Sequence, residues 1–257
     1  MYKGLISDFD GTMHDKNRVI SAPVQDALRR LTHAGFKFGF ATGRQFDFIE
    51  PHACRFGEAH VVSGGACLVN SAGEVIRQHL IPAPVMRDVA EFIDQHGGSI
   101  VVKTHKHGYG NPPAMEMARS RPGLNLTPLD EIPTWDAASF YISSLPDEAW
   151  QVLLVRKDIL LYKQRSRSGQ LGFVADGVAP GVSKVTGIEW WCEYHNIRLE
   201  ELVAIGDAEN DLDMIEAAGL GLAVDNAVVE LKTIADAVVP SLQDDGVAWA
   251  IKEYFKV

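Results

Sequence analysis

Short apolar runs alternate with helix-spaced segments in the first third of the chain, and this rhythm restricts the fold more than any other feature of the sequence. Three runs have the length of buried strands: 2–7, 36–41 and 60–63. Two segments between them have helical spacing: 24–34 and 46–54. Ser21 is placed to cap the first helix, and Pro23 fits its first turn. Strand, helix and strand in this order predict right-handed βαβ units and a parallel sheet.

The last third repeats the rhythm. Its predicted helices are 184–195, 212–218, 228–235 and 247–255, and its predicted strands are 202–205, 221–224 and 237–239. We therefore expect an α/β fold with a doubly wound, Rossmann-like parallel sheet as its core.

The middle of the chain has a different texture, opened by Pro82-Ala83-Pro84 and closed by Pro180-Gly181. Helices are expected at 85–96 and 147–156, strands at 99–104, 139–144, 159–163 and 171–175, and loops at 108–113 and 120–123. The prediction is an α/β domain over 83–179 that is inserted into the core. The core then comprises 1–82 and 180–257, with the prolines marking the hinges.

Composition excludes several classes of protein. The 257 residues are 46% hydrophobic, and the formal net charge of −10 disfavours nucleic-acid binding. Three scattered cysteines support neither a disulfide framework nor a zinc site. We find no signal peptide and no apolar run near the roughly 20 residues that span a bilayer. A cytoplasmic protein without membrane partners, monomeric or homodimeric, is expected.

Two carboxylates stand at the end of the first predicted strand, in Asp8-Phe9-Asp10-Gly11-Thr12. Open parallel sheets bind ligands at this end of their strands. In an extended backbone, Asp8 and Asp10 would point to the same face. A divalent cation would relieve their repulsion, and magnesium prefers such oxygen ligands. The alternative is an aspartate pair that only shapes a turn.

Three further motifs can complete such a site. Thr42 and Gly43 follow the second strand. The Thr42 hydroxyl could bind a phosphate oxygen, and Gly43 would let the backbone approach it closely. The alternative is that Thr42 is simply the N-cap of a helix. Lys184 opens a predicted helix and could neutralise a phosphoryl group, although most lysines are simply exposed. In Gly206-Asp207-Ala208-Glu209-Asn210-Asp211, two carboxylates and an amide are aimed at one point, with capping as the alternative.

Together, these motifs resemble the haloacid dehalogenase (HAD) superfamily, which has D-x-D-G-T, a Thr or Ser after strand two, a Lys, and G-D-x-x-N-D. The insertion resembles the large α/β cap of Cof-type (class II, subtype B) members, many of which are sugar-phosphate phosphatases. Other phrases are similar to that group: Pro180-Gly181-Val182-Ser183-Lys184, Asp225-Asn226-Ala227 and Asp245-Gly246-Val247-Ala248.

The resemblance implies a role for each residue. Asp8 would be the nucleophile that forms an aspartyl-phosphate, and Asp10 the general acid and base, with Thr42 and Lys184 completing the catalytic set. The implied Mg²⁺ ligands are Asp8, Asp10 through its main-chain carbonyl, Asp207 and Asp211. The implied phosphate-binding residues are Thr12, Thr42, Gly43, Lys184 and Asn210. The expected substrate is a small phosphate ester, probed by an inserted domain whose polar candidates are His105, His107, Tyr109, Arg119, Arg121, Lys163, Arg165 and Arg167.

Two departures from the family pattern concern specificity. Cof-type chains often have Ser-Asn-Gly-Ala where this chain has Ser63-Gly64-Gly65-Ala66, and a Lys-Gly pair where Val185 follows Lys184. Other activities stay open. A sugar phosphomutase or other phosphotransferase shares this core, and a receiver-like phosphorylation switch, without turnover, uses a similar set of residues. A non-catalytic binding protein and a dehalogenase are disfavoured by the intact acids.

Overall fold

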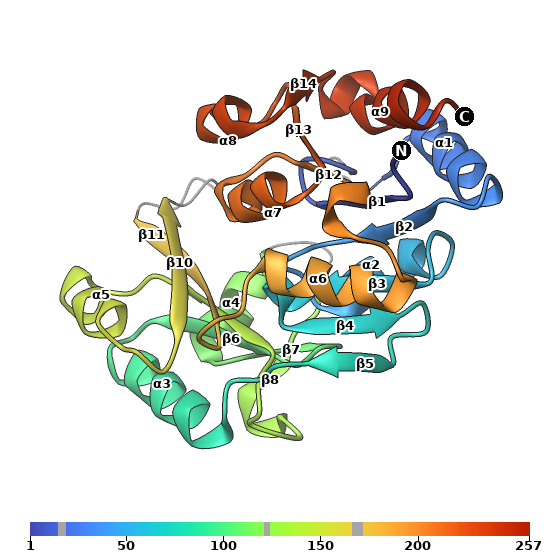
Figure 1. The fold of residues 1–257 in the computed structure, drawn as a ribbon. Coiled ribbons are helices and arrows are strands. Elements are labelled where there is room, and N and C mark those ends of the chain that lie inside the picture. Colours follow the sequence, from blue (N-terminus) through green and yellow to red (C-terminus); the bar gives the residue numbers. More distant parts are fainter. Residues whose placement is uncertain (15–18, 121–123, 166–171) are drawn as a thin grey trace.

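A parallel five-stranded sheet, in the order β14-β13-β12-β1-β2, forms the centre of the core (Figure 1). The computed structural model describes residues 1–14, 19–120, 124–165 and 172–257, with the backbone alone at 164 and 165. The strands are β1 (Gly4–Ser7), β2 (Lys37–Phe40), β12 (Leu202–Gly206), β13 (Leu220–Val224) and β14 (Ala237–Val239). All neighbours in this sheet pair in parallel, which confirms the predicted fold class.

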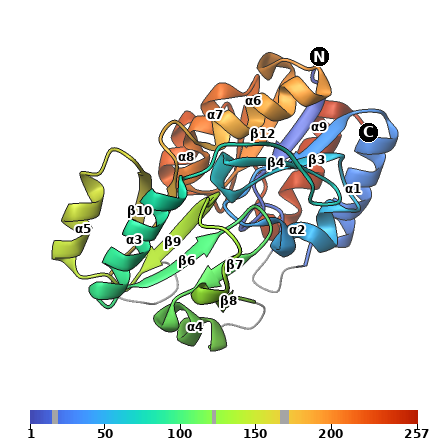
Figure 2. The same cartoon turned by 90° about the horizontal axis from the view of Figure 1, so that it is seen from below.

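Helices cover both faces of this sheet. They are α1 (Ala22–His33), α2 (Phe46–Ala53), α6 (Lys184–His195), α7 (Leu212–Ala217), α8 (Val229–Ile234) and α9 (Gly246–Phe255). Helices α1 and α9 lie side by side on one face, and α6 and α7 on the other (Figures 1 and 2). The first helix begins as predicted, because the Ser21 hydroxyl accepts a hydrogen bond from the Val24 backbone N–H.

A small antiparallel sheet adjoins the edge of the core at β2. It consists of β3 (Ala59–Val62), β4 (Cys67–Asn70) and β5 (Val75–Gln78), and a parallel bridge between Ala41 and Val61 connects it to the core. Only β3 was expected from the sequence. Strand β5 is exposed along its whole length, so it has no apolar pattern that would predict it.

Residues 83–179, which we call the insert, form a six-stranded sheet in the order β10-β11-β9-β6-β7-β8 (Figure 2). Its strands are β6 (Ser99–Lys103), β7 (Gly108–Gly110), β8 (Thr127–Pro128), β9 (Ser139–Ser143), β10 (Leu160–Arg165) and β11 (Phe173–Val178). Its helices are α3 (Ala83–Gln95), α4 (Pro112–Arg119) and α5 (Asp147–Leu154). The predicted strand at 171–175 corresponds to β11, with residue 171 outside the described residues. The domain boundaries themselves stay a prediction.

Helix α4 and strand β7 correct the sequence analysis, which expected a loop at 108–113. The Asn111 side chain accepts a hydrogen bond from the Ala114 N–H, and Pro112 occupies the first turn of α4. These residues favour turns and helix starts equally, so a local reading does not separate the two.

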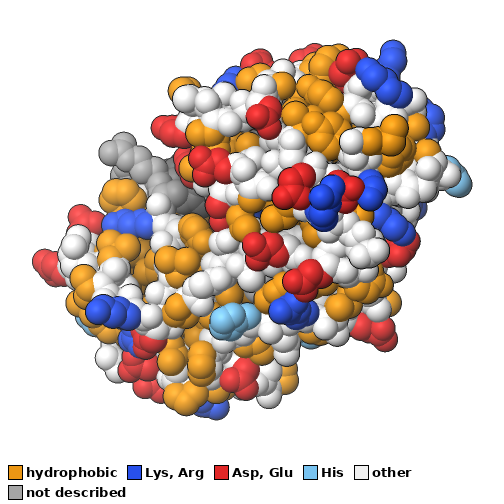
Figure 3. All heavy atoms as spheres, in the orientation of Figure 1, with side chains coloured by type: hydrophobic (Ala, Val, Ile, Leu, Met, Phe, Trp, Pro, Cys, Tyr) orange, Lys and Arg blue, Asp and Glu red, His pale blue; other side chains and the backbone are white. Residues whose placement is uncertain are grey.

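Buried apolar side chains form one continuous cluster from the core into the insert. The described side chains on the face in Figure 3 mix acids and bases. All three cysteines are free. Within the described ranges, no helix combines the length and apolar character that crossing a bilayer requires.

Candidate active site

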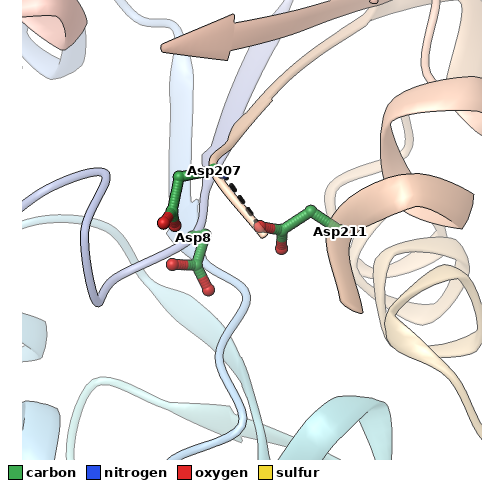
Figure 4. Close-up of side chains that lie close together, drawn as sticks. All are labelled: Asp8, Asp207 and Asp211. Carbon is green, nitrogen blue, oxygen red and sulfur yellow. Dashed lines mark hydrogen bonds between the residues drawn. The ribbon is translucent and has the colours of Figure 1, made fainter. Parts of the chain in front are cut away.

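Three buried carboxylates meet where two neighbouring parallel strands end (Figure 4). Asp8 follows β1 and Asp207 follows β12, and Asp211 comes from the short turn after Asp207. One oxygen of each lies within 4.8 Å of the others, and the residues are 5%, 6% and 0% exposed, respectively. Carboxylates that lie this close together and this far from water are unfavourable in their ionised form unless a cation compensates their charge.

Lys184 supplies one such cation from the first residue of α6. Its Nζ lies 2.5 Å from Asp8 Oδ1 and also donates to Asp211 Oδ1. Burial alone would lower the pKa of Lys184, but Asp211 and Asp8 outweigh it and raise the pKa, so the ammonium stays charged. Burial raises the pKa of Asp8, and Lys184 opposes that shift only in part. A second cation would therefore favour the ionised form of Asp8.

The position of Asp211 is fixed by its own loop. Its Oδ2 accepts hydrogen bonds from the backbone N–H groups of Asp207 and Ala208, both at 3.0 Å. Gly206 is required beside it, because a Cβ there would lie 2.7 Å from the Asp211 side chain. With Lys184 on its other oxygen, Asp211 acts mainly as a fixed anion within the cluster.

Asp207 is held by the segment that contains Asp8. The Thr12 hydroxyl donates to Asp207 Oδ1 at 3.1 Å. Gly11 has φ 85°, and a Cβ there would lie only 2.6 Å from Asp207 Oδ2. The loop after β1 therefore fits closely around this carboxylate.

Asp10 points away from the cluster towards Arg44. Arg44 donates from Nε to Asp10 Oδ2 at 2.8 Å and from Nη2 to Oδ1 at 3.1 Å, and His14 Nε2 lies 3.5 Å from Oδ1. Partial withdrawal from water would raise the pKa of Asp10, but Arg44 and His14 outweigh it and lower that pKa well below its usual range. The sequence analysis expected Asp8 and Asp10 to point to the same face of an extended strand. Strand β1 ends at Ser7, so the alternation of side chains along a strand does not apply to Asp10. Both residues nevertheless border the same cavity.

That cavity has a volume of about 340 Å³ and lies between the core and the insert. Six predicted site residues border it: Asp8, Asp10, Thr42, Gly43, Asp207 and Asn210. Lys184 borders an adjoining cavity instead. Thr12 and Asp211 are buried and border neither cavity, and the Thr12 hydroxyl donates to Asp207.

The sequence analysis missed three charged residues that border the main cavity: Arg44, Lys103 and Asp176. Lys103, from β6, is buried and pairs with Asp176 of β11 at 3.0 Å. A signal was available for Arg44, which directly follows Thr42-Gly43. For Lys103 there was no such signal, because it stands at the end of an apolar run that predicts only a strand.

The polar candidates of the insert are dispersed. His105, His107 and Tyr109 border a different cavity beside α2 and β5, and Arg119 pairs with Glu116 at the surface. Lys163 borders the cavity that contains Lys184. Arg121, Arg167 and the side chain of Arg165 lie outside the described residues.

The sequence model of the haloacid dehalogenase-like hydrolases matches residues 5–251. A phosphoglycolate phosphatase of Methanoculleus marisnigri is 28% identical over 99% of this chain and 97% of its own length. A putative phosphatase of Haemophilus influenzae is 26% identical over 99% of both chains.

Solved structures share the fold. BT1666 from Bacteroides thetaiotaomicron, described as a HAD phosphatase, has a TM-score of 0.83 at 23% identity, covering 100% of this chain and 96% of that one. The HAD subclass IIB sugar phosphatase BT4131 has a TM-score of 0.81 at 23% identity, covering 99% and 100%.

The fold and the acidic site define a hydrolase that is built on a Rossmann-like sheet. The chain belongs to the haloacid dehalogenase-like hydrolase family, because the family match spans nearly all of it. The resemblance drawn from its motifs is thereby confirmed, as is the expectation of an enzyme of this class.

Proposed function

We propose that the chain is a Mg²⁺-dependent phosphatase that hydrolyses small phosphate monoesters through an aspartyl-phosphate at Asp8. The observation that carries this proposal is the buried cluster of Asp8, Asp207 and Asp211 around the ammonium of Lys184. The relatives that align with the whole chain support it, because they are named as phosphatases.

The residues at the cluster suit Mg²⁺. All donors are oxygens, their carboxylates lie close together, and the Gly11 loop leaves no room for a side chain beside Asp207. Asp8 and Asp207 would hold the ion directly, with the main-chain carbonyl of Asp10, and Asp211 would assist. When bound, the ion neutralises charge on the nucleophile and on the phosphate oxygens.

The reaction then divides into two displacements. A carboxylate oxygen of Asp8 attacks phosphorus, the bond to the ester oxygen breaks, and Asp10 gives its proton to the departing alcohol. Asp10 then takes a proton from water, whose oxygen attacks the aspartyl-phosphate and releases inorganic phosphate and the Asp8 carboxylate. The pairing of Asp10 with Arg44 lowers the pKa of Asp10, which favours the deprotonated form that the second step needs and disfavours the protonated form that the first step needs.

The remaining polar groups would bind the phosphate. The backbone at Gly43, the side chains of Thr42 and Asn210 and the ammonium of Lys184 all border one of the two adjoining cavities. The insert covers this position, since Lys103 donates to the Gly43 carbonyl at 3.3 Å. A covered site of this size suits phosphorylated metabolites, such as sugar phosphates, rather than phosphoproteins.

Phosphate release from a panel of metabolite monophosphates, measured with Mg²⁺ and with EDTA, tests the proposal. Asp8→Asn should lower release by about 10³-fold or more, with an unchanged circular dichroism spectrum. Asp130→Asn, at an exposed position of the insert, serves as the control. Retained activity in Asp8→Asn would overturn the mechanism.

The nature of the product separates the other activities of this core. Free phosphate identifies a hydrolase, whereas an isomeric phosphate ester identifies a mutase. A stable phosphoprotein without turnover identifies a switch.

A further inference from the structure

A second cavity of about 120 Å³ adjoins the main one. The two share Gly43, Asp176 and Asn210 along their borders, and Lys184 borders the second. This volume holds several water-sized groups, since about 10–15 Å³ of such space suffices for one. A short polar chain fits this space.

Two buried hydroxyl groups on the border of this cavity have no hydrogen-bond partner among the described residues. They belong to Ser63, 0% exposed in the turn after β3, and to Ser139, 2% exposed at the start of β9. One therefore comes from the core and the other from the insert. Buried hydroxyl groups normally form hydrogen bonds. Two that lack partners on the border of one cavity indicate a ligand that supplies those partners.

The backbone around Ser63 is shaped to keep this arrangement. Ser63 has φ 55°, a strained value for a residue with a side chain, and strain of this kind concentrates at functional sites. The next residue, Gly64, also borders the cavity, and a Cβ there would meet only Val178 Cγ1 at 3.4 Å. The absence of a side chain at Gly64 leaves this part of the cavity open.

Among the described residues that border the two cavities, three of the four lysines and arginines are paired with carboxylates. The pairs are Lys103 with Asp176, Arg44 with Asp10, and Lys184 with Asp8 and Asp211. The Lys163 ammonium lies 4.0 Å from the centre of the Phe173 ring. A second anionic group on the ligand would therefore have only Lys163 to pair with, and it would have to draw that ammonium from its contact with the ring.

We propose that the second cavity is a leaving-group subsite, in which Ser63 and Ser139 bind hydroxyl groups of an uncharged substrate chain. The inference rests on the proposed phosphatase activity. A hydroxyl both donates and accepts, so each serine can pair with a substrate hydroxyl in either sense. Asp176, which is paired with Lys103 through one oxygen, can accept a further hydrogen bond from the same chain through the other.

Three six-carbon esters test the preference: sorbitol 6-phosphate, hexyl phosphate and 6-phosphogluconate. They present hydroxyls, no hydroxyls, and hydroxyls with a terminal carboxylate. We expect kcat/KM for sorbitol 6-phosphate to exceed that of each other ester by at least about tenfold. p-Nitrophenyl phosphate serves as a reference for the chemical steps.

Single alanine variants assign the preference to the serines. Ser139→Ala and Ser63→Ala should each lower kcat/KM for sorbitol 6-phosphate by about two- to tenfold, mainly through KM, and leave hexyl phosphate unchanged. Ser99→Ala is the matched control, because Ser99 also has a buried, unpartnered hydroxyl but borders neither cavity. Ser139→Ala should not lower the Tm, since it removes a hydroxyl that has no partner in the described part of the chain.

Two results would overturn the subsite. One is equal or better turnover of hexyl phosphate or 6-phosphogluconate by the wild type. The other is a loss in Ser139→Ala that is the same for hexyl phosphate and sorbitol 6-phosphate. Failure of the proposed phosphatase itself would look different, because p-nitrophenyl phosphate would then not be hydrolysed either.

Discussion

Lys184 is the residue on which the charge balance of the buried site depends. It is 3% exposed and bonds to Asp8 and Asp211, both of which are buried. Removing one partner of such a group leaves uncompensated charge in a dry environment. The same ammonium that would bind phosphate therefore also stabilises the protein without its substrate.

Lys184→Met should lower the free energy of unfolding by about 3–5 kcal/mol in the absence of divalent cations. Urea denaturation of the purified protein measures this. Lys37→Met, which removes the partly exposed pair with Glu58, should cost at most about 1 kcal/mol. Equal losses in the two variants would show that Lys184 has no special structural role.

His60 gives the protein a dependence on pH away from the site. It is fully buried, its Nδ1 accepts from the Phe40 N–H, and its Nε2 lies 3.1 Å from the Ala53 carbonyl. Burial lowers its pKa to about 4, although the bond to Ala53 opposes that shift. The folded protein thus holds the neutral ring, whereas the unfolded chain binds a proton near pH 6.5.

The sign of the effect follows from this difference. Stability from His60 is fully present above about pH 6.5 and is lost progressively as the pH falls towards 4, by about 3 kcal/mol in total. Urea unfolding at pH 7.5, 6 and 5 should show a shallower dependence in His60→Gln than in the wild type. Parallel curves for the two proteins would contradict the assignment.

Among the elements, those with strong local signals were predictable. Helix α6 runs from Lys184 to His195 as expected, because Ser183 and Thr186 form a capping box at its start. The hairpin of β4 and β5 was not, since its stability depends on packing beside β3 rather than on its own pattern. Local sequence indicates where an element starts, but not which neighbour it will pair with.

The same distinction applies to the candidate site. Asp8, Thr42 and Asp207 could be predicted to converge, because the carboxyl ends of parallel strands meet at one edge. The pair of Lys103 and Asp176 could not, because it joins two strands of the insert that are 73 positions apart. Its position over the cavity depends on how the insert packs on the core.

The turn after β3 gives a prediction at the scale of an element. Gly64 has φ 71° and space for a side chain, whereas at Gly65, with φ 102°, a Cβ would lie 1.8 Å from the Ser183 carbonyl oxygen. Asparagine tolerates the left-handed region, so Gly64→Asn should change the Tm by less than about 3 °C. Gly65→Asn should lose several times more, because the turn must separate from α6. Similar Tm values for both variants, from thermal melts, would contradict this.

At the scale of the whole molecule, the insert is held against the core beside the active site. The Phe46 and Asp47 N–H groups, at the start of α2, donate to the carbonyls of His105 and Lys106 at 2.8 and 3.1 Å. The side chains of Asp47 and His107 also pair at 2.9 Å. Since α2 begins two residues after Arg44, these contacts connect the insert to the segment that carries the partner of Asp10.

The carboxylate cluster joins separate parts of the chain, so metal binding should stabilise the molecule as a whole. Asp8 and Asp207 are far apart in sequence, and unfolding would separate them. An ion that binds only the folded state adds about 2.7 kcal/mol at a hundredfold excess over its Kd. For a chain of this size, that corresponds to a rise in Tm of roughly 5–10 °C.

Thermal melts with increasing MgCl₂, compared with melts in EDTA, measure this rise. Asp207→Asn should abolish most of it, because the cluster loses an anionic ligand, whereas Asp130→Asn on the insert surface should not change it. The comparison depends on binding rather than on turnover, so it tests the metal site independently of any substrate. A Tm that does not respond to Mg²⁺, or that responds equally in Asp207→Asn, would place the ion elsewhere and leave Lys184 as the only cation that balances the cluster.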